Sequence, residues 1–366
     1  MLQFFQKLRE REKSNYGNNN ADRLLIFDYF RAISCLLIYC LHLITFNYKG
    51  KVFPYYHLIF NILPMTVFFF TTGYLISMSL EKETNWKSFA IKRFFRLVPV
   101  LLVAHVIALF TIRSHISIKD FFLNVFMLTD VFYLKQNAWN HALIFTTWSL
   151  WVEMKFYIIA CFCFAIFKNR NNKRAICYMQ ITIATIISLL LVLFKVPWFQ
   201  NGSFNCTLCV FVVFSGMLMY FYRKRYIKLV EYLILSIICI AVPIFIFRTY
   251  VGTDYTWLEA YGKGAVITTI IFLLFSKRVK ENRFIKTFAD LSYSFYLLHP
   301  VALFMATKFW SFQKNDSLTL LFKAIGHRTF FAILILCVCY VIYHKIEKPA
   351  YEFGRKIAKR IMKSQP

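Results

Sequence analysis

Acidic side chains are scarce in this sequence. Its 366 residues include 17 Asp and Glu against 44 Lys and Arg, which gives a formal net charge of +27. Such an excess suits a nucleic-acid-binding protein when the cations form one basic face, but here they lie in short clusters between apolar runs. With 59% hydrophobic and 20% aromatic residues, the composition also excludes an ordinary soluble domain. We therefore expect a polytopic membrane protein that binds no nucleic acid and whose cations are placed by topology.

The sequence also lacks the spacings that metal sites and disulfide frameworks need. Eight of the ten cysteines lie singly or one residue apart in or beside apolar runs, where they act as small hydrophobes. Cys206 and Cys209 have a metal-like or redox-like spacing, but no second pair completes a site. We therefore assign no metal and expect no bound cofactor.

Ten apolar runs are the candidates for crossing a bilayer, whose hydrocarbon core of about 30 Å takes roughly 20 residues of α-helix. They cover residues 24–46, 55–79, 97–112, 143–167, 175–195, 204–222, 229–247, 257–276, 286–306 and 320–343. Basic loops stay on the cytoplasmic side, and with the N-terminus inside, this topology puts 30 of the 44 Lys and Arg there. We therefore expect an all-α protein of about ten spanning helices with both termini cytoplasmic.

These runs divide the chain into three parts. Residues 1–23 are polar and charged, and we expect them to form a cytoplasmic tail instead of a cleavable signal. The transmembrane domain is expected over residues 24–343, followed by a basic cytoplasmic tail over 344–366.

One further segment, residues 119–134 (KDFFLNVFMLTDVFYL), is apolar but short, and Asn124 and Asp130 interrupt it. A full span here would move every later basic loop to the other side of the membrane. Irregular backbone survives at membrane depth where protein or a cavity covers it. We therefore predict a re-entrant or interfacial hairpin at the outer face.

The first apolar run contains two conspicuous polar side chains, Arg31 and His42. Eleven helical steps amount to three turns and roughly 20°, so the two residues share one face, about 16 Å apart in depth. An arginine in a spanning helix costs about 2.5–3.5 kcal/mol on insertion scales, so it must face a partner or a wet cavity. We interpret this face as the wall of a functional site, with His42 toward its outer end.

The fourth run carries a carboxylate. Glu153 lies one helical turn after Ser149, with Trp148 beside them. An ionisable group inside a membrane is a functional candidate because its charge must be compensated. The alternative is that Glu153 simply neutralises Arg31 or Lys155 and holds helices together.

Two more polar clusters complete the set. Arg93 and Arg96 lie three residues apart at the cytoplasmic start of the third helix, where guanidinium forks suit phosphate oxygens, although basic residues flank most inner helix ends. The ninth run contains DLSYSFYLLHP, where packing between helices is at least as good a role for the hydroxyls as contact with substrate. Its polar members are Ser292, Tyr293, Tyr296 and His299.

Taken in order, these motifs resemble the acyltransferase 3 family, bacterial integral membrane proteins that acylate cell-surface sugars. The matching stretches run through nearly the whole chain: FDYFRAISCLLIYCLH, FFFTTGYLIS, KRFFRLVP, TTWSLWVE, FSGMLM, LSYSFYLLHP and IEKPAYEFGRK. Thr72 stands where the family commonly has serine, and Ala32 where glycine is usual; such departures bear on the shape of the acceptor site. We expect the stand-alone form, without the extracytoplasmic domain that some relatives carry.

The resemblance implies an enzyme of the bacterial inner membrane that moves an acyl group, acetyl in the first instance, from cytoplasmic acyl-CoA to a sugar hydroxyl. The acceptor would be a surface or exported glycan or a lipid-linked saccharide, and membrane lipids would be the other partners. On that interpretation His42 is the base or a transient acyl carrier. Arg31 holds part of the donor or orients the site, and Glu153 fixes the tautomer of His42 or binds the sugar.

The same resemblance assigns the remaining candidates. Arg93 and Arg96 would bind the phosphates of the donor. Contacts with substrate are expected from Asp28, Trp148, Ser149, Ser292, Tyr293 and His299.

Two other classes stay open on the residues alone. A transporter or flippase of a lipid-linked saccharide would line its path with the same arginine, histidine and glutamate. A non-catalytic scaffold would tolerate the replacement of each by an apolar residue. Within the enzyme class, succinyl transfer is an alternative to acetyl transfer.

Overall fold

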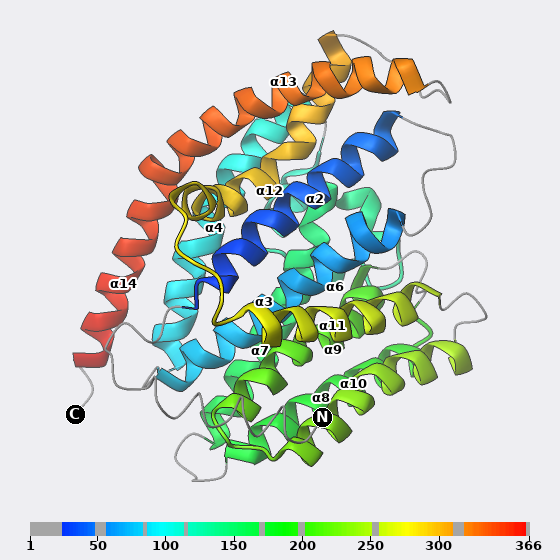
Figure 1. Ribbon diagram of the computed structural model, residues 1–366, viewed down its shortest axis with the longest axis vertical. Coiled ribbons are helices and arrows are strands. Elements are labelled where there is room, and N and C mark those ends of the chain that lie inside the picture. The colour runs from blue at the N-terminus through cyan, green and yellow to red at the C-terminus, as the bar shows by residue number, and fades with distance from the viewer. Residues whose placement is uncertain are drawn as a thin grey trace.

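The computed structural model describes residues 24–47, 56–82, 86–112, 116–167, 173–196, 202–250, 256–309 and 318–363. Within these ranges every regular element is a helix (Figure 1). In the part of the chain that the structure describes, ten helices have 20 or more residues: α2 (Ile26–Asn47), α3 (Leu63–Lys82), α4 (Trp86–Thr111), α7 (Trp148–Phe167), α8 (Lys173–Leu193), α9 (Gly202–Arg223), α10 (Leu229–Tyr250), α11 (Thr256–Phe275), α12 (Arg283–Phe309) and α13 (Leu318–Ile342). The all-α class is confirmed, and each long helix overlaps one predicted span. The predicted N-terminal tail, residues 1–23, lies outside the described residues.

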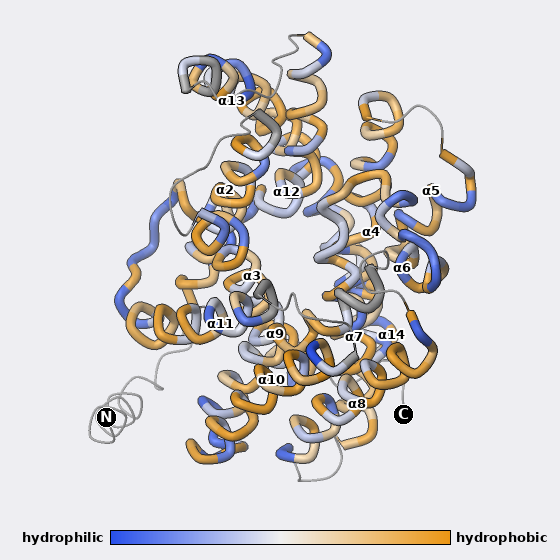
Figure 2. Tube along the Cα trace, turned by 90° about the vertical axis from the view of Figure 1, so that its right-hand side faces the viewer, coloured by the Kyte–Doolittle hydropathy of each residue, from blue (hydrophilic) through white to orange (hydrophobic). Residues whose placement is uncertain are grey.

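Seven helical stretches of the described chain are long and apolar enough to cross a membrane. They are residues 26–45, 58–82, 86–111, 145–167, 173–193, 229–249 and 322–361. Hydrophobic residues predominate along the long helices, and hydrophilic ones gather mainly toward their ends (Figure 2). The chain is therefore a multi-pass membrane protein, whereas the count of ten crossings and the side of the termini stay predictions.

The centre of the bundle is α3, which packs against α2, α7, α9 and α11. Two glycines allow its closest crossing, with α9. A Cβ atom on Gly73 would lie 2.0 Å from the carbonyl oxygen of Val213, and one on Gly216 would lie 1.8 Å from that of Phe70. Because small residues let helix backbones approach closely in membranes, this pair sets how tightly α3 and α9 pack.

We expect Gly216→Ala, and likewise Gly73→Ala, to lower the thermal midpoint of the detergent-solubilised protein by several degrees. Overpacking a core costs about 1–3 kcal/mol, and here the obstacle is backbone, which cannot rotate away. The control is Gly326→Ala in α13, where a Cβ would meet nothing within 4 Å. Alanine favours a helix over glycine by about 1 kcal/mol, so this variant should match or exceed the wild type. Equal midpoints for Gly216→Ala and Gly326→Ala would contradict the tight crossing.

The described C-terminal residues continue the helix beyond the last predicted span. From α13 the helix continues through a π-helical stretch, Tyr343–Glu347, into α14 (Lys348–Lys363). Figure 1 shows the two helices, orange to red, as one long rod along the edge of the bundle. The rings of Phe353 and Phe95 lie 5.3 Å apart, so α14 packs along α4. The boundary predicted after residue 343 thus falls inside a continuous helical rod.

The segment predicted as a hairpin forms two short helices, α5 (Ile118–Val125) and α6 (Thr129–Phe132), joined by a turn in which Met127 has a φ of 59°. The two polar residues that interrupt it, Asn124 and Asp130, both have hydrogen-bond partners within the protein. The buried Asn124 amide donates to the carbonyl oxygens of Asp120 at 2.8 Å and His141 at 2.7 Å. Asp130 accepts a hydrogen bond from Lys155 of α7. Internal partners therefore replace water for both side chains.

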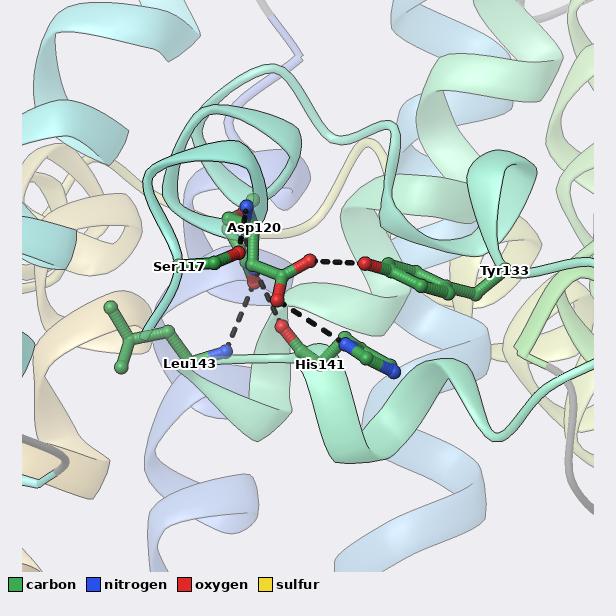
Figure 3. A network of polar contacts seen from close by, with 6 residues as sticks. Ser117, Asp120, Tyr133, His141 and Leu143 are labelled. Carbon is green, nitrogen blue, oxygen red and sulfur yellow. Dashed lines mark hydrogen bonds and ion pairs between the residues drawn. The ribbon is translucent and has the colours of Figure 1, made fainter. Parts of the chain in front are cut away.

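A polar network holds the open end of this hairpin (Figure 3). The Asp120 carboxylate accepts a hydrogen bond from Tyr133 at 2.5 Å and lies 3.4 Å from Nδ1 of His141. The rings of Tyr133 and His141 stack with their centroids 3.6 Å apart. Partial burial raises the pKa of Asp120, but hydrogen bonds from its neighbours lower it by more, so the net shift is downward.

A carboxyl group whose pKa is lowered by folding stabilises the folded state above its unfolded pKa, about 3.9 for Asp, and this contribution is lost as the pH falls through the folded value. We therefore expect the hydrogen-exchange protection factors across residues 117–143 to decrease when the pH is lowered below about 4. In Asp120→Asn they should be low at neutral pH and lack this acid dependence. Glu231→Gln, which removes another carboxylate bonded to a tyrosine (Tyr178, 3.1 Å), is the control and should leave the hairpin unchanged. An acid dependence that persists in Asp120→Asn would contradict the assignment.

Candidate functional site

A cavity of about 360 Å³ lies among α2, α3, α4, α7, α12 and the stretch that joins α13 to α14. Four cations line it: Arg31, Lys82, Arg93 and Arg96. Three acids line it as well: Glu153, Asp290 and Glu347. Helices from both ends of the sequence thus build one charged chamber inside an apolar bundle.

Arg31 faces this cavity, as its place in an apolar helix predicts. Its Nη2 donates to Oδ1 of Asp28 at 2.7 Å, one turn earlier in α2. Within the described residues its buried Nε has no hydrogen-bond partner. Asp28, a predicted substrate contact, is not among the residues that line the cavity; it binds Arg31. The guanidinium is therefore partly compensated and keeps a free donor.

The two arginines of α4 also reach the cavity. Cζ of Arg93 lies 5.0 Å from the ring centroid of Phe89 and 5.8 Å from that of Tyr157, so aromatic faces support its guanidinium. No described residue accepts a hydrogen bond from its buried Nε. Since a buried donor without an acceptor is costly, this nitrogen is available to an oxygen of a ligand.

Glu153 is held by hydroxyl groups. It accepts a hydrogen bond from Thr72 of α3 at 2.5 Å and another from Tyr157, one turn later in α7, at 3.0 Å. Neither predicted ion pair forms: Arg31 pairs with Asp28, and Lys155 pairs with Asp130. The interpretation of Glu153 as a simple neutraliser of those cations is therefore wrong. Thr72 keeps the hydroxyl that a serine would supply there.

His42 belongs to a pair of imidazoles. Its Nδ1 lies 2.8 Å from Nε2 of His299 on α12, and the ring planes are within 8° of parallel. The edge of Phe145 packs against His42, with centroids 4.9 Å apart. Glu153, one of whose suggested roles was to fix the tautomer of His42, binds Thr72 and Tyr157 instead, so that role is wrong. His299, predicted to contact substrate, contacts His42 instead.

The histidine pair lies beyond one end of the cavity. Neither imidazole lines the cavity, whereas Ile38 and Tyr296, each about one helical turn before a histidine of the pair, do. The rings of Tyr296 and Phe68 stack with centroids 6.0 Å apart. The ring of Tyr296 also lies 5.8 Å from that of His299, so Tyr296 lies between the cavity that it lines and the histidine pair. We call the stacked rings of Tyr296 and Phe68 the aromatic layer.

Ser149 contacts Tyr296 of the aromatic layer. Its hydroxyl lies 2.9 Å from the hydroxyl of Tyr296, which also donates to the carbonyl oxygen of Thr146 at 2.9 Å. Trp148, half-buried, packs against Phe69 with ring centroids 6.0 Å apart and does not line the cavity. Both residues were predicted to contact substrate, and the structure gives them packing partners within the protein.

Ser292 and Tyr293 line the cavity, as a substrate contact requires. The Ser292 hydroxyl donates to the carbonyl oxygen of Ala289 at 2.7 Å, and that of Tyr293 donates to Leu97 at 3.1 Å. Their donor hydrogens are thus used within the protein, and their oxygens stay available as acceptors.

Comparison with known proteins decides the family. A family model described as an acyltransferase domain matches residues 24–344. The chain belongs to the acyltransferase 3 family. Searches of curated proteins and of solved structures gave no match. The resemblance seen in the sequence is confirmed, and the protein is a membrane acyltransferase.

Several cavity residues of this acyltransferase were not singled out from the sequence. Tyr157 is one turn after Glu153, a spacing that signals a contact. Glu347 lies in the matching stretch IEKPAYEFGRK; it lines the cavity and accepts a hydrogen bond from Ser294 at 2.8 Å. Lys82 lines it from the end of α3. Within the described residues no three His, Cys, Asp or Glu side chains cluster as metal ligands, and the side chain of Cys206 lies outside that part.

Proposed function

We propose that this acyltransferase moves an acyl group, acetyl in the first instance, from cytoplasmic acyl-CoA to a sugar hydroxyl of a surface or exported glycan. Its place would be the bacterial inner membrane. One observation carries the proposal: a cation-lined cavity and a histidine pair occupy successive levels along α2, with Ile38 at the end of one and His42 in the other. An anionic donor and a base are thereby brought to neighbouring sites.

The cavity suits the donor. Coenzyme A carries several phosphates, and guanidinium forks bind phosphate oxygens bidentately. Among the described residues, Arg31 and Arg93 each keep a buried Nε without a hydrogen-bond partner, and phosphate oxygens would satisfy these two donors. Arg96 and Lys82 add positive charge to the walls of the same cavity.

The histidine pair suits the acceptor. In the proposed step, Nε2 of His42 takes the proton of the sugar hydroxyl while the oxygen of that hydroxyl attacks the thioester carbonyl carbon. The carbon–sulfur bond then breaks, and the leaving thiolate takes the proton from the imidazolium to give free CoA. Because the aromatic layer lies between the cavity and the pair, the acyl end of the donor must pass Phe68 and Tyr296 to reach His42.

The proposal predicts that His42→Ala abolishes transfer. Membranes that contain the wild type, given labelled acetyl-CoA, should label a surface polysaccharide, and the variant should lose this by about 10²–10⁴-fold with normal membrane insertion. The matched control is His105→Leu, since His105 is a fully buried histidine of α4 whose Nδ1 contacts only the carbonyl of Leu101, at 2.8 Å. A wild type that changes the location of a glycan without incorporating label would be a transporter.

The donor site makes a separate prediction. Arg93→Gln and Arg96→Gln should each raise the KM for acetyl-CoA about 10-fold or more, because a hydrogen bond to a charged group contributes about 1.5–3 kcal/mol. Initial rates at varied donor concentration measure this. Arg174→Gln is the control: Arg174 lies in the first turn of α8, outside the cavity, and its Nε donates to the carbonyl oxygen of Tyr226. An equal rise in KM in all three variants would point to general electrostatic attraction instead of a built site.

A further inference from the structure

The fully buried His299 has a determined tautomer. Its Nδ1 lies 3.3 Å from the carbonyl oxygen of Phe295, one turn earlier in α12. A carbonyl oxygen can only accept a hydrogen bond, so Nδ1 of His299 carries the proton. A neutral imidazole has one N–H, and therefore Nε2 of His299 is an acceptor.

This acceptor determines the tautomer of the second ring. The only nitrogen of His42 within hydrogen-bond distance of Nε2 of His299 is Nδ1, at 2.8 Å. Nδ1 of His42 must then be the donor, which leaves the lone pair of His42 on Nε2. In the described part of the chain Nε2 of His42 has no hydrogen-bond partner, and its ring is half-buried where that of His299 is fully buried. The free lone pair thus lies on the more open ring.

Aromatic rings hold His299 in place. The rings of Tyr39, Phe295 and Tyr296 have their centroids 6.3, 6.1 and 5.8 Å from its own. Among the described residues no carboxylate contacts either imidazole. A catalytic histidine is commonly oriented by a carboxylate, which fixes the tautomer and stabilises the imidazolium. Here the orienting group is itself a neutral imidazole.

We propose that His299 is the positioning residue of this acyltransferase: it accepts the Nδ1–H of His42 and so presents Nε2 of His42 as the proton acceptor. When His42 takes a proton at Nε2, its Nδ1–H becomes a charge-assisted donor to His299, which strengthens the same hydrogen bond. No proton has to move to His299. The role in catalysis rests on the proposed function, whereas the tautomer does not.

The tautomer is tested by ¹⁵N NMR of protein labelled at histidine and held in lipid nanodiscs, where protonated and unprotonated ring nitrogens have well separated shifts. Signals that disappear in His42→Ala belong to His42. In the wild type we expect a protonated Nδ1 and an unprotonated Nε2. A protonated Nε2 on neutral His42 would overturn the proposal without any reference to activity.

Two substitutions test the dependence on His299. In His299→Leu the acceptor is lost, and His42 should become a mixture of both tautomers. In His299→Gln the amide oxygen can take the place of Nε2, and His42 should keep the wild-type tautomer. His105→Leu, which removes a buried imidazole that hydrogen-bonds to the Leu101 carbonyl of its own helix, should leave His42 unchanged. Retention of the wild-type tautomer in folded His299→Leu would overturn the proposal.

Kinetics separate positioning from donor binding. His299→Leu should lower kcat for acyl transfer about 10- to 100-fold, a part of what a positioned base contributes, with the KM for acetyl-CoA within about twofold of the wild type. His299→Gln should recover most of the loss. An unchanged kcat in His299→Leu would overturn the role in catalysis. A wild type that transfers no acyl group would refute the proposed function, and the NMR result would still decide the tautomer.

Discussion

A charged side chain inside a bilayer must find its compensation within the protein, and this constraint explains most of the polar architecture here. Arg31 has Asp28 at 2.7 Å in its own helix, and Lys155 has Asp130 from the hairpin. Glu153 is held by two hydroxyl groups. Each of these three charges is met by a near neighbour. In the described part of the chain Arg31 and Arg93 still keep a buried Nε without a hydrogen-bond partner, and such donors are what a phosphate-bearing ligand needs.

The same constraint gives the hairpin its role. Lys155 in the middle of α7 obtains its partner only because α5 and α6 carry Asp130 into the bundle. The segment that follows the hairpin then leads to Phe145, whose ring edge packs on His42. A short element that could not span the membrane by itself thus compensates a buried lysine and shapes one side of the histidine pair. Its loss would affect two parts of the bundle together.

Periodicity and motif order predict much of this molecule. The apolar runs predict the long helices, and the two polar interruptions at Asn124 and Asp130 identify the segment that forms two short helices. The helical spacing of Arg31 and His42 places them along one face, where the structure puts a cavity and an imidazole pair at successive levels. The hydrogen-bond partners of these side chains were harder to predict. Thr72 and Glu153 are 81 positions apart, and His42 and His299 are 257 apart, so neither contact follows from helical spacing. Glu153 was therefore expected beside His42, whereas its carboxylate accepts hydrogen bonds from the hydroxyl groups of Thr72 and Tyr157 at the cavity.

The separation of the cavity from the histidine pair has a mechanistic consequence. For a thioester held by the arginines to reach His42, the Tyr296 side chain must move away from Phe68. Its hydroxyl then loses the contacts with Ser149 and the carbonyl of Thr146, each at 2.9 Å. A neutral hydrogen bond contributes about 0.5–1.5 kcal/mol net, so opening costs about 1–3 kcal/mol, which the binding of a large anionic donor can offset. The aromatic layer would then make access to His42 depend on occupancy of the cation-lined cavity.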